Sequence, residues 1–245
     1  MKILVCITHV PDTTAKISFV DGNTTFNSEG VQYIIGPYDD YALARAVEIK
    51  EAQGGEIVAL HVGTAASEPT IRKALAIGAD RAIRIDADPR DSLFVAQEIA
   101  AIARKDTYDM ILMGRESIDF NGAVVHGMVA ELLGMPCVSP AMKLEINGNK
   151  ATLLKEIEGG KETIEVNLPF VAGCQEPIAE WKIPNMRGIM AARTKPLEVL
   201  APSMSNNATK IESFELPPAK GTVKLVSPDN VEELVRLLKS EAKVL

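Results

Sequence analysis

The sequence predicts an α/β protein with an open, mostly parallel sheet that has helices on both faces. Short apolar runs rich in Ile, Val and Leu alternate along the chain with longer segments of helical periodicity, which is typical of parallel strands joined by crossover helices. The core is expected to be aliphatic, because 47% of the residues are apolar and only 4% are aromatic. Strands of this kind are buried on both faces, so they show little alternation of apolar and polar residues.

The alternation of strands and helices occupies the chain up to Met135. A turn signal at Asp21-Gly22-Asn23 predicts a hairpin between segments 16–20 and 31–35. Ser67 is expected to cap the second helix, and Gly134 is expected to end the fourth. The predicted strands cover 3–7, 57–62, 82–85 and 110–113, and the predicted helices cover 39–53, 67–77, 93–104 and 123–133.

The pattern changes after Met135. Short alternating strands at 143–146, 151–157 and 162–166 are separated by glycine-containing turns. They indicate antiparallel additions to the sheet, arranged as hairpins. A further apolar strand is predicted at 170–173.

Beyond Cys174 little regular pattern remains for about fifty residues, and prolines interrupt the segment repeatedly. The segment is too apolar for a solvated linker, so we expect an extended arm laid over another surface, with disorder as the alternative. A helix over 231–243 closes the chain. We therefore divide the chain into an α/β domain, 1–175, and a C-terminal part, 176–245, with a loop, an arm and a terminal helix.

Composition argues against several classes of function. The chain has 26 Lys and Arg against 33 Asp and Glu, a formal net charge of −7, which is unsuited to nucleic-acid binding. Its three cysteines and three histidines are too dispersed for a zinc, haem-attachment or dithiol motif, so no metal site is expected. The N-terminal apolar stretch is too short for a signal peptide, and no apolar run of about 18 residues follows. A cytoplasmic protein outside the membrane is expected.

The most informative candidate site follows the strand at 110–113. In an open parallel sheet, ligands bind beyond the carboxyl ends of the strands. Gly114 lets a ligand approach the backbone, and Asp119 and Asn121 lead into a helix whose free amides can hold an anion such as phosphate. A tight turn with Asn121 as the helix cap explains these residues equally well. His126, in the following helix, is expected to be a partly buried structural histidine.

The chain carries no recognisable catalytic set. Neither a P-loop nor a Gly-x-Gly-x-x-Gly motif occurs, and there is no Gly-x-Ser-x-Gly elbow. The pair Asp39-Asp40 is more simply the acidic N-terminus of a helix than an acid-base pair. We expect no enzymatic activity of the chain's own.

Several segments resemble the β subunit of electron transfer flavoprotein. They are GRESID at 114–119, TIRKALAIGAD at 70–80, KEIEGGKET at 155–163 and IPNMRGIMAAR at 183–193. The resemblance spans almost the whole chain, with the motifs in the same order. It implies an adenine nucleotide alpha hydrolase-like, Rossmann-like fold and an electron carrier without substrate chemistry of its own.

The resemblance also implies a heterodimer. In that family the α subunit holds most of the FAD, and the β subunit covers part of the isoalloxazine ring, here near Asp12, Thr13 and Tyr38. As an alternative, Tyr38 staples the entry of the following helix. The complex would carry electrons from flavin dehydrogenases, such as the acyl-CoA dehydrogenases of fatty acid β-oxidation, to a quinone oxidoreductase or another acceptor. The C-terminal arm and helix would pack on the α subunit.

Family β subunits bind a second adenine nucleotide, AMP in the simple carriers and a second FAD in the electron-bifurcating members. AMP is the expectation here, although Val10-Pro11-Asp12-Thr13 resembles the bifurcating members and leaves FAD and NADH oxidation open. A usual Gln is missing from 123–126, so backbone amides must replace side-chain donors, or the site is weak or empty. The implied contacts are Cys6, Gly36, Pro37, Tyr38, Asp39, Val62, Gly114, Arg115, Glu116, Ser117, Ile118, Asp119, Phe120, Asn121, Gly122, Ala123, Val124 and Val125.

The segment 183–193 resembles the family's partner-recognition loop. Met186 stands where the family places an exposed leucine that anchors into dehydrogenases, and Ile189 and Met190 follow it. A flexible methionine suits pockets of varied shape. Alternatively, Met186 packs against the α subunit. A function of another class also stays open, a stand-alone adenine-nucleotide-binding regulatory module of the universal-stress type, which leaves this segment unexplained.

Overall fold

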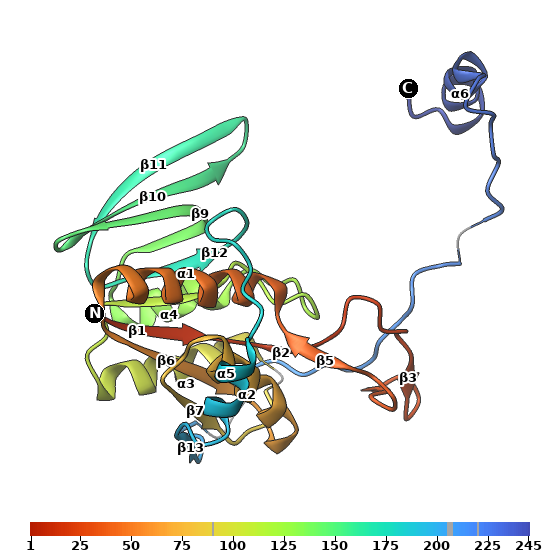
Figure 1. Ribbon diagram of the computed structural model, residues 1–245. Helices are drawn as coiled ribbons and strands as arrows, with labels where there is room; N and C mark the ends of the chain where they lie inside the picture. The colour runs from red at the N-terminus through yellow and green to blue at the C-terminus, as the bar shows by residue number, and fades with distance from the viewer. Residues whose placement is uncertain (90, 205–207, 220) are drawn as a thin grey trace.

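A nine-stranded sheet forms the centre of the computed structural model, which describes residues 1–89, 91–204, 208–219 and 221–245 (Figure 1). The strand order is β11-β10-β9-β12-β8-β1-β6-β7-β13. Two short ribbons, β2 with β5 and β3 with β4, stand apart from this sheet.

The middle of the sheet is parallel, as the sequence predicts. Side chains along β1 alternate between two cores, with Ile3 and Val5 in one and Leu4 and Cys6 in the other. Both cores exclude water, which explains why these strands are apolar at nearly every position. The parallel strands of this region are β1 (Lys2–Cys6), β6 (Glu56–Val62), β7 (Arg81–Ile85), β8 (Met110–Gly114) and β12 (Phe170–Cys174).

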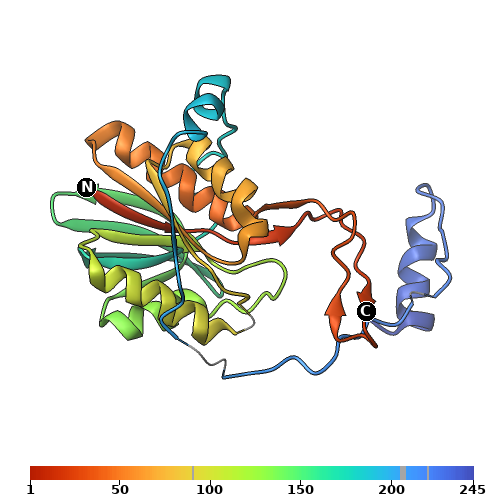
Figure 2. The same cartoon turned by 90° about the horizontal axis from the view of Figure 1, so that it is seen from below.

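Helices cover both faces of the sheet, which confirms the predicted fold class. The helices α1 (Pro37–Gln53) and α2 (Glu68–Ile77) pack on the face of Ile3 and Val5. The helices α3 (Ser92–Lys105) and α4 (Val125–Leu133) pack on the opposite face. Figure 2 shows the two pairs on opposite sides, α1 and α2 in orange and α3 and α4 in yellow-green. A single 3-10 turn, η1 (Ala65–Ser67), precedes α2.

The strand order reverses between β1 and β8. From β1 the chain runs outward through β6 to β7, and it then crosses back to place β8 on the other side of β1. A reversal of this kind opens a crevice beyond the carboxyl ends of the two strands. The fold therefore predicts a ligand site next to the ends of β1 and β8.

The predicted antiparallel additions form one end of the sheet. They are β9 (Cys137–Asn147), β10 (Lys150–Ile157) and β11 (Gly160–Asn167). Strand β9 pairs in parallel with β12 and antiparallel with β10, so it joins the two halves of the sheet. It begins at Cys137, well before the predicted start at residue 143.

The predicted N-terminal hairpin is wrong in its pairing. The turn at Asp21-Gly22-Asn23 is present, with positive φ at all three residues, but it joins β3 (Phe19–Val20) to β4 (Thr25–Phe26). The segment predicted as the second strand instead provides β5 (Tyr33–Ile35), which pairs with β2 (His9–Pro11). A turn signal identifies a reversal of the chain but not how far the pairing extends.

Two helix starts also differ from the prediction. Helix α4 begins at Val125, because Asn121 and Ala123 have φ values of 49° and 50°, a left-handed conformation that a helix cannot continue through. Asn121 therefore does not cap this helix. Ser67 stands at the N-cap position of α2, but its hydroxyl donates to the Thr64 carbonyl at 2.7 Å.

The segment after Cys174 contains more regular structure than the sequence predicts. It forms helix α5 (Met186–Ala192) and strand β13 (Leu197–Leu200), which pairs in parallel with β7 and becomes an edge of the main sheet. The prediction of an irregular arm is wrong for these stretches, and the division between residues 175 and 176 stays a prediction.

An extended path then leads to the terminal helix. Helix α6 (Val231–Leu237) continues into a π-helical turn, η2 (Leu238–Ala242), and both lie away from the sheet (Figures 1 and 2). On the way, the Phe214 ring stacks on Phe19 with the ring centroids 4.7 Å apart. In the described part of the chain, no helix combines the length and apolar character that crossing a membrane requires.

Candidate functional site

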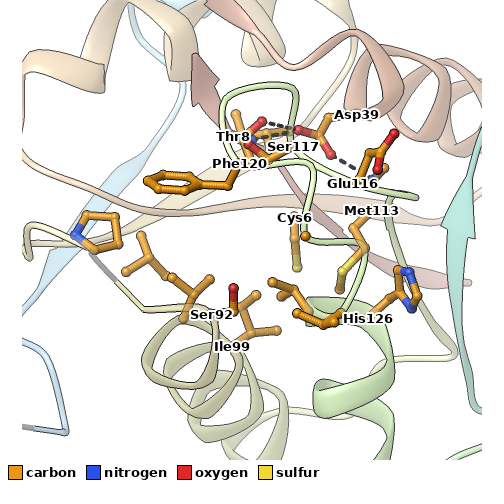
Figure 3. Close-up of a pocket in the computed structure, with 18 of the residues that line it drawn as sticks. Cys6, Thr8, Asp39, Ser92, Ile99, Met113, Glu116, Ser117, Phe120 and His126 are labelled. Atoms are coloured by element: carbon orange, nitrogen blue, oxygen red, sulfur yellow. Dashed lines mark hydrogen bonds between the residues drawn. The ribbon is translucent and has the colours of Figure 1, made fainter. Parts of the chain in front are cut away.

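A cavity of about 200 Å³ lies beyond the carboxyl ends of β1, β6 and β8, at the point where the strand order reverses. Figure 3 shows Thr8, Asp39 and Ser117 on one side of it and Ser92 and Ile99 of α3 on the other. Cys6 and Met113, at the ends of β1 and β8, lie between them. The lining is mostly apolar, and the loop after β8 contributes Arg115, Glu116, Ser117 and Asp119 to its polar part.

Asp39 ties the elements around this cavity together. Its carboxylate accepts hydrogen bonds from the Thr8 amide at 2.8 Å, the Thr8 hydroxyl at 2.5 Å and the Gly114 amide at 2.7 Å. These donors fix the ends of β1 and β8 to the first turn of α1. Burial outweighs the three donors and raises the pKa of Asp39 to about 6.

Two glycines allow this close approach. A Cβ atom on Gly114 would lie 2.7 Å from both the Asp39 carboxylate and the Tyr38 Cβ. A Cβ atom on Gly36 would collide with the Thr8 hydroxyl. At Gly114 the close neighbours belong to α1, and the approach of a ligand to this glycine stays a prediction.

Arg115 is the one lysine or arginine among the described residues that line the cavity. Its guanidinium donates to Glu116 at 2.8 Å and to Gln175 at 2.9 Å, and it lies 4.9 Å from the centre of the Tyr38 ring. The hydrogen bonds that Arg115 donates to Glu116 hold the pKa of Arg115 above its usual value. The cation is thus largely engaged by protein groups.

The loop from Ser117 to Val124 leads to the exposed amides of α4. Val124 is the N-cap residue, and its valine side chain cannot cap the first amides of the helix. The first amides of any helix lack partners within it and carry partial positive charge. The backbone can therefore offer donors to an anion where the side chains of 123–125 offer none.

Burial lowers the pKa of the three histidines that line the cavity, His9, His61 and His126. His61 Nδ1 lies 2.9 Å from the Ile7 carbonyl oxygen, and burial lowers the pKa of His61 to about 4. His9 stacks on Tyr33 with centroids 4.3 Å apart. His126 Nε2 lies 3.0 Å from the Arg115 carbonyl oxygen, which agrees with the predicted structural role, although the ring also lines the cavity.

The structure brings most of the predicted nucleotide-contact residues to one place. Their contact with a nucleotide stays a prediction. Those that line the cavity are Cys6, Asp39, Val62, Gly114, Arg115, Glu116, Ser117, Asp119, Phe120, Gly122, Ala123, Val124 and Val125. The predicted residues outside its lining are Gly36, Pro37, Tyr38, Ile118 and Asn121.

Sequence reasoning missed the wall that α3 provides. Ser92, Val95 and Ile99 line the cavity, and Asp91 caps α3 by accepting from the Leu93 and Phe94 amides. An acidic N-cap that follows a buried strand is a signal that could have drawn attention to this segment. No group of three or more His, Cys, Asp or Glu side chains suited to a metal ion occurs among the described residues.

The predicted docking residues lie on a separate surface formed by α5, which packs against α2 (Figure 1). The side chains of Met186, Ile189 and Met190 are 74%, 40% and 59% exposed. Arg72 of α2 donates to the Ala192 carbonyl at 3.0 Å and to the Lys195 carbonyl at 2.9 Å. The end of α5 is therefore fixed while its apolar residues stay accessible.

Comparison with known proteins relates the whole chain to one family. A family model described as the electron transfer flavoprotein domain matches residues 23–205. The electron transfer flavoprotein subunit beta of Bacillus subtilis (strain 168) is 36% identical, over all of both chains. The subunit beta of Syntrophomonas wolfei is 37% identical over this entire chain and 98% of its own. The human subunit beta is 30% identical over this entire chain and 99% of its own.

Proposed function

Since the chain belongs to the electron transfer flavoprotein β-subunit family, we propose that it forms a heterodimer with an α subunit and carries electrons from flavin dehydrogenases. Acyl-CoA dehydrogenases are the donors we propose, and a quinone oxidoreductase or another carrier is the acceptor. The chain supplies a scaffold, part of the flavin cover and a docking surface. Full-length similarity to named β subunits is the observation that carries this proposal.

The cavity at the strand reversal is the proposed AMP site. Its apolar walls, which include Val62, Ile99 and Val125, suit the faces of a purine, and the free amides of α4 suit a single phosphate. The size of the cavity favours a mononucleotide over a second FAD. Because Arg115 is engaged by Glu116 and Gln175, the phosphate must be held mainly by backbone groups.

The residues proposed to cover the FAD of the α subunit lie outside this cavity. Tyr38 is half-buried under the Arg115 guanidinium, and Asp12 accepts from the Thr14 amide at 2.8 Å, which shapes the loop that exposes Thr13. The Tyr38 ring, held by Arg115, and the loop shaped by Asp12 suit contact with one face of the flat isoalloxazine ring. FAD, when bound, supplies the reversible uptake of electrons, while this chain excludes water from part of the ring.

The arm and α6 are proposed to pack on the α subunit. Val231, Leu234 and Val235 of α6 are exposed in the isolated chain, as are Val223 and Leu225 before it. An apolar stripe on a helix that lies away from its own core usually marks an interface. The alternative function is a stand-alone regulatory module of the universal-stress type. Such a module would need neither this apolar surface nor the exposed residues of α5.

Co-expression with an α subunit tests the proposal. We expect a stable yellow complex with one copy of each subunit. A colourless chain that does not bind the α subunit, or that forms a homodimer alone, would contradict the carrier and favour the regulatory module.

Counting adenine against flavin in an acid extract of the purified complex tests the AMP site. We expect two adenine-containing molecules per complex, one FAD and one AMP. A single FAD per complex would mean that the loss of side-chain donors at 123–126 has emptied the site. Two FAD per complex would instead indicate a bifurcating member.

A further inference from the structure

We propose that Asp40 is a positioning residue that fixes the approach to the docking helix α5 through Trp181, an inference that rests on the proposed docking function. Asp40 lies in the first turn of α1, and Trp181 lies in the loop that leads to α5. The Trp181 Nε1–H group donates to Asp40 Oδ2 at 3.1 Å. The hydrogen bond thus joins two segments far apart in the sequence, five residues before the exposed Met186.

The Asp40 carboxylate stands where three elements meet. Lys73 of α2 places its Nζ 3.6 Å from the same Oδ2 atom, so one oxygen receives a donor from the loop and a cation from α2. The Asp40 side chain is only 9% exposed. A charge-assisted hydrogen bond to a largely buried carboxylate is stronger than one between two exposed groups, so this contact can fix the loop.

The other oxygen of Asp40 argues that the carboxylate is not there for stability alone. Among the described residues, Asp40 Oδ1 is buried and has no hydrogen-bond partner. A buried polar atom without a partner costs free energy, and an apolar residue would avoid that cost. The presence of a carboxylate here is explained if its Oδ2 atom is needed to hold Trp181.

The opposite end of the docking segment is fixed by different groups. Arg72 donates to the carbonyls of Ala192 and Lys195, and Lys195 Nζ donates to the carbonyls of Leu75 at 2.8 Å and Ala79 at 2.6 Å. The Asn185 side chain caps α5 by accepting from the Gly188 amide at 2.8 Å. With Asp40 at one end and α2 at the other, the segment presents Met186 in one orientation.

Two substitutions at Asp40 separate shape from charge and hydrogen bonding. Asp40→Asn keeps an oxygen that can accept from Trp181, whereas Asp40→Leu removes both the acceptor and the charge but fills the space. Glu51→Gln is the matched control, because Glu51 pairs with Lys182 of the same loop at 3.5 Å in an exposed position, where ion pairs contribute little.

The chain contains one tryptophan, which gives a direct readout. The chain is labelled with 5-fluorotryptophan and assembled with an unlabelled α subunit and FAD, so that one fluorine resonance reports Trp181. We expect Asp40→Leu to shift and narrow this resonance, as a released side chain should, and Asp40→Asn and Glu51→Gln to leave it close to wild type. An unchanged resonance in Asp40→Leu would overturn the proposal.

Electron transfer from a flavin dehydrogenase gives the second readout. Asp40→Leu should raise the KM for the dehydrogenase about tenfold, with kcat and flavin content unchanged, because a mobile docking segment weakens binding rather than the electron transfer step. Asp40→Asn should restore most of the affinity. A fall in kcat or in flavin content with KM unchanged would overturn the proposal.

Trp181→Phe guards against misfolding of the Asp40 variants, because it removes the N–H donor and keeps an aromatic ring at a residue that is 56% exposed. Its effect on KM should not add to that of Asp40→Leu, since both remove the same contact. Additive effects would contradict the proposal. If Met186→Ala leaves KM unchanged while the fluorine resonance still responds to Asp40→Leu, the docking function fails and the contact itself stands.

Discussion

The role of Asp39 in the structure goes well beyond the one that the sequence suggests. The sequence explains an acidic residue in the first turn of a helix by the helix dipole alone. In the structure, Asp39 is buried and accepts from Thr8 and Gly114, which lie in two other elements. A local pattern cannot reveal these partners, because they come from the ends of two strands that only the sheet brings together.

The raised pKa of Asp39 predicts a pH dependence of stability. The pKa is about 6 in the folded chain against 3.8 for an unperturbed aspartate, so the folded state binds the proton more tightly. The free energy of unfolding should therefore fall as the pH rises from about 4 to about 6, by about 3 kcal/mol at most. Asp39→Asn has no proton to lose and should lack this part of the dependence.

Unfolding of the purified complex at a fixed protein concentration, between pH 4 and 7, checks this expectation, because subunit binding itself contributes to the measured stability. As the pH rises from about 4 to about 6, the free energy of unfolding of the wild type should fall relative to that of Asp39→Asn. A difference that is constant with pH would contradict the assignment.

Among the elements, those with strong local signals were predicted well. The parallel strands are apolar runs of the right length, and α2 and α3 have clear helical periodicity, so the alternation of strands and helices and the sheet type followed from the sequence. Strand β13 could not be predicted, because Leu197–Leu200 forms a strand only by pairing with β7, more than a hundred residues earlier in the chain. The start of α4 was missed because the left-handed conformation of Ala123 has no sequence signal.

Only part of the candidate site could be predicted, because only part of it has a local sequence signal. The loop after β8 was recognisable from its glycines and acidic residues, whereas the contribution of Ser92, Val95 and Ile99 depends on how α3 packs. Helix α5 shows that a sequence motif can identify a segment without revealing its conformation. The sequence predicted a docking loop at 183–193, and in the structure Met186–Ala192 of this segment form a helix that packs on α2.

Met186→Ala tests the role of α5. Met186 is 74% exposed, so its truncation should not destabilise the chain, but it should lower kcat/KM with a flavin dehydrogenase about tenfold if the side chain enters a partner pocket. Ile157→Ala, at another exposed apolar residue on β10, is the matched control and should leave kcat/KM unchanged. Equal effects of the two changes would remove Met186 from a docking role.

At the scale of the whole molecule, the chain has the surface of half a complex. The sheet, its helices and the cavity form one body, while the segment after β13 is extended and ends in a helix with an uncovered apolar side. Carboxylates of α3 and its N-cap hold the start of this segment. The buried Glu98 accepts from the Ser203 amide at 2.8 Å, and Asp91 accepts from the Thr209 amide at 2.6 Å.

Replacing the apolar residues of α6 tests whether this surface binds the α subunit. The combined change of Val231, Leu234 and Val235 to Ser should raise the Kd of the heterodimer about 100-fold, since each lost side chain contributes about 1 kcal/mol when partly buried. Glu232→Ser on the same helix is the control. Analytical ultracentrifugation of the mixed subunits measures the effect, and an unchanged Kd would show that α6 does not contact the α subunit.

Strand β13 has a consequence for how quickly a partner can come and go. Because β13 is hydrogen-bonded to β7, the segment that carries Met186 is a closed loop of the folded body and not a free tail. Ordering a free segment costs about 1 to 2 kcal/mol of conformational entropy per residue at the moment of binding. Here that cost is already met by folding, so the proposed docking would need only a small apolar contact. A small contact also gives a short residence time, which suits a carrier that must leave one partner before it meets the next.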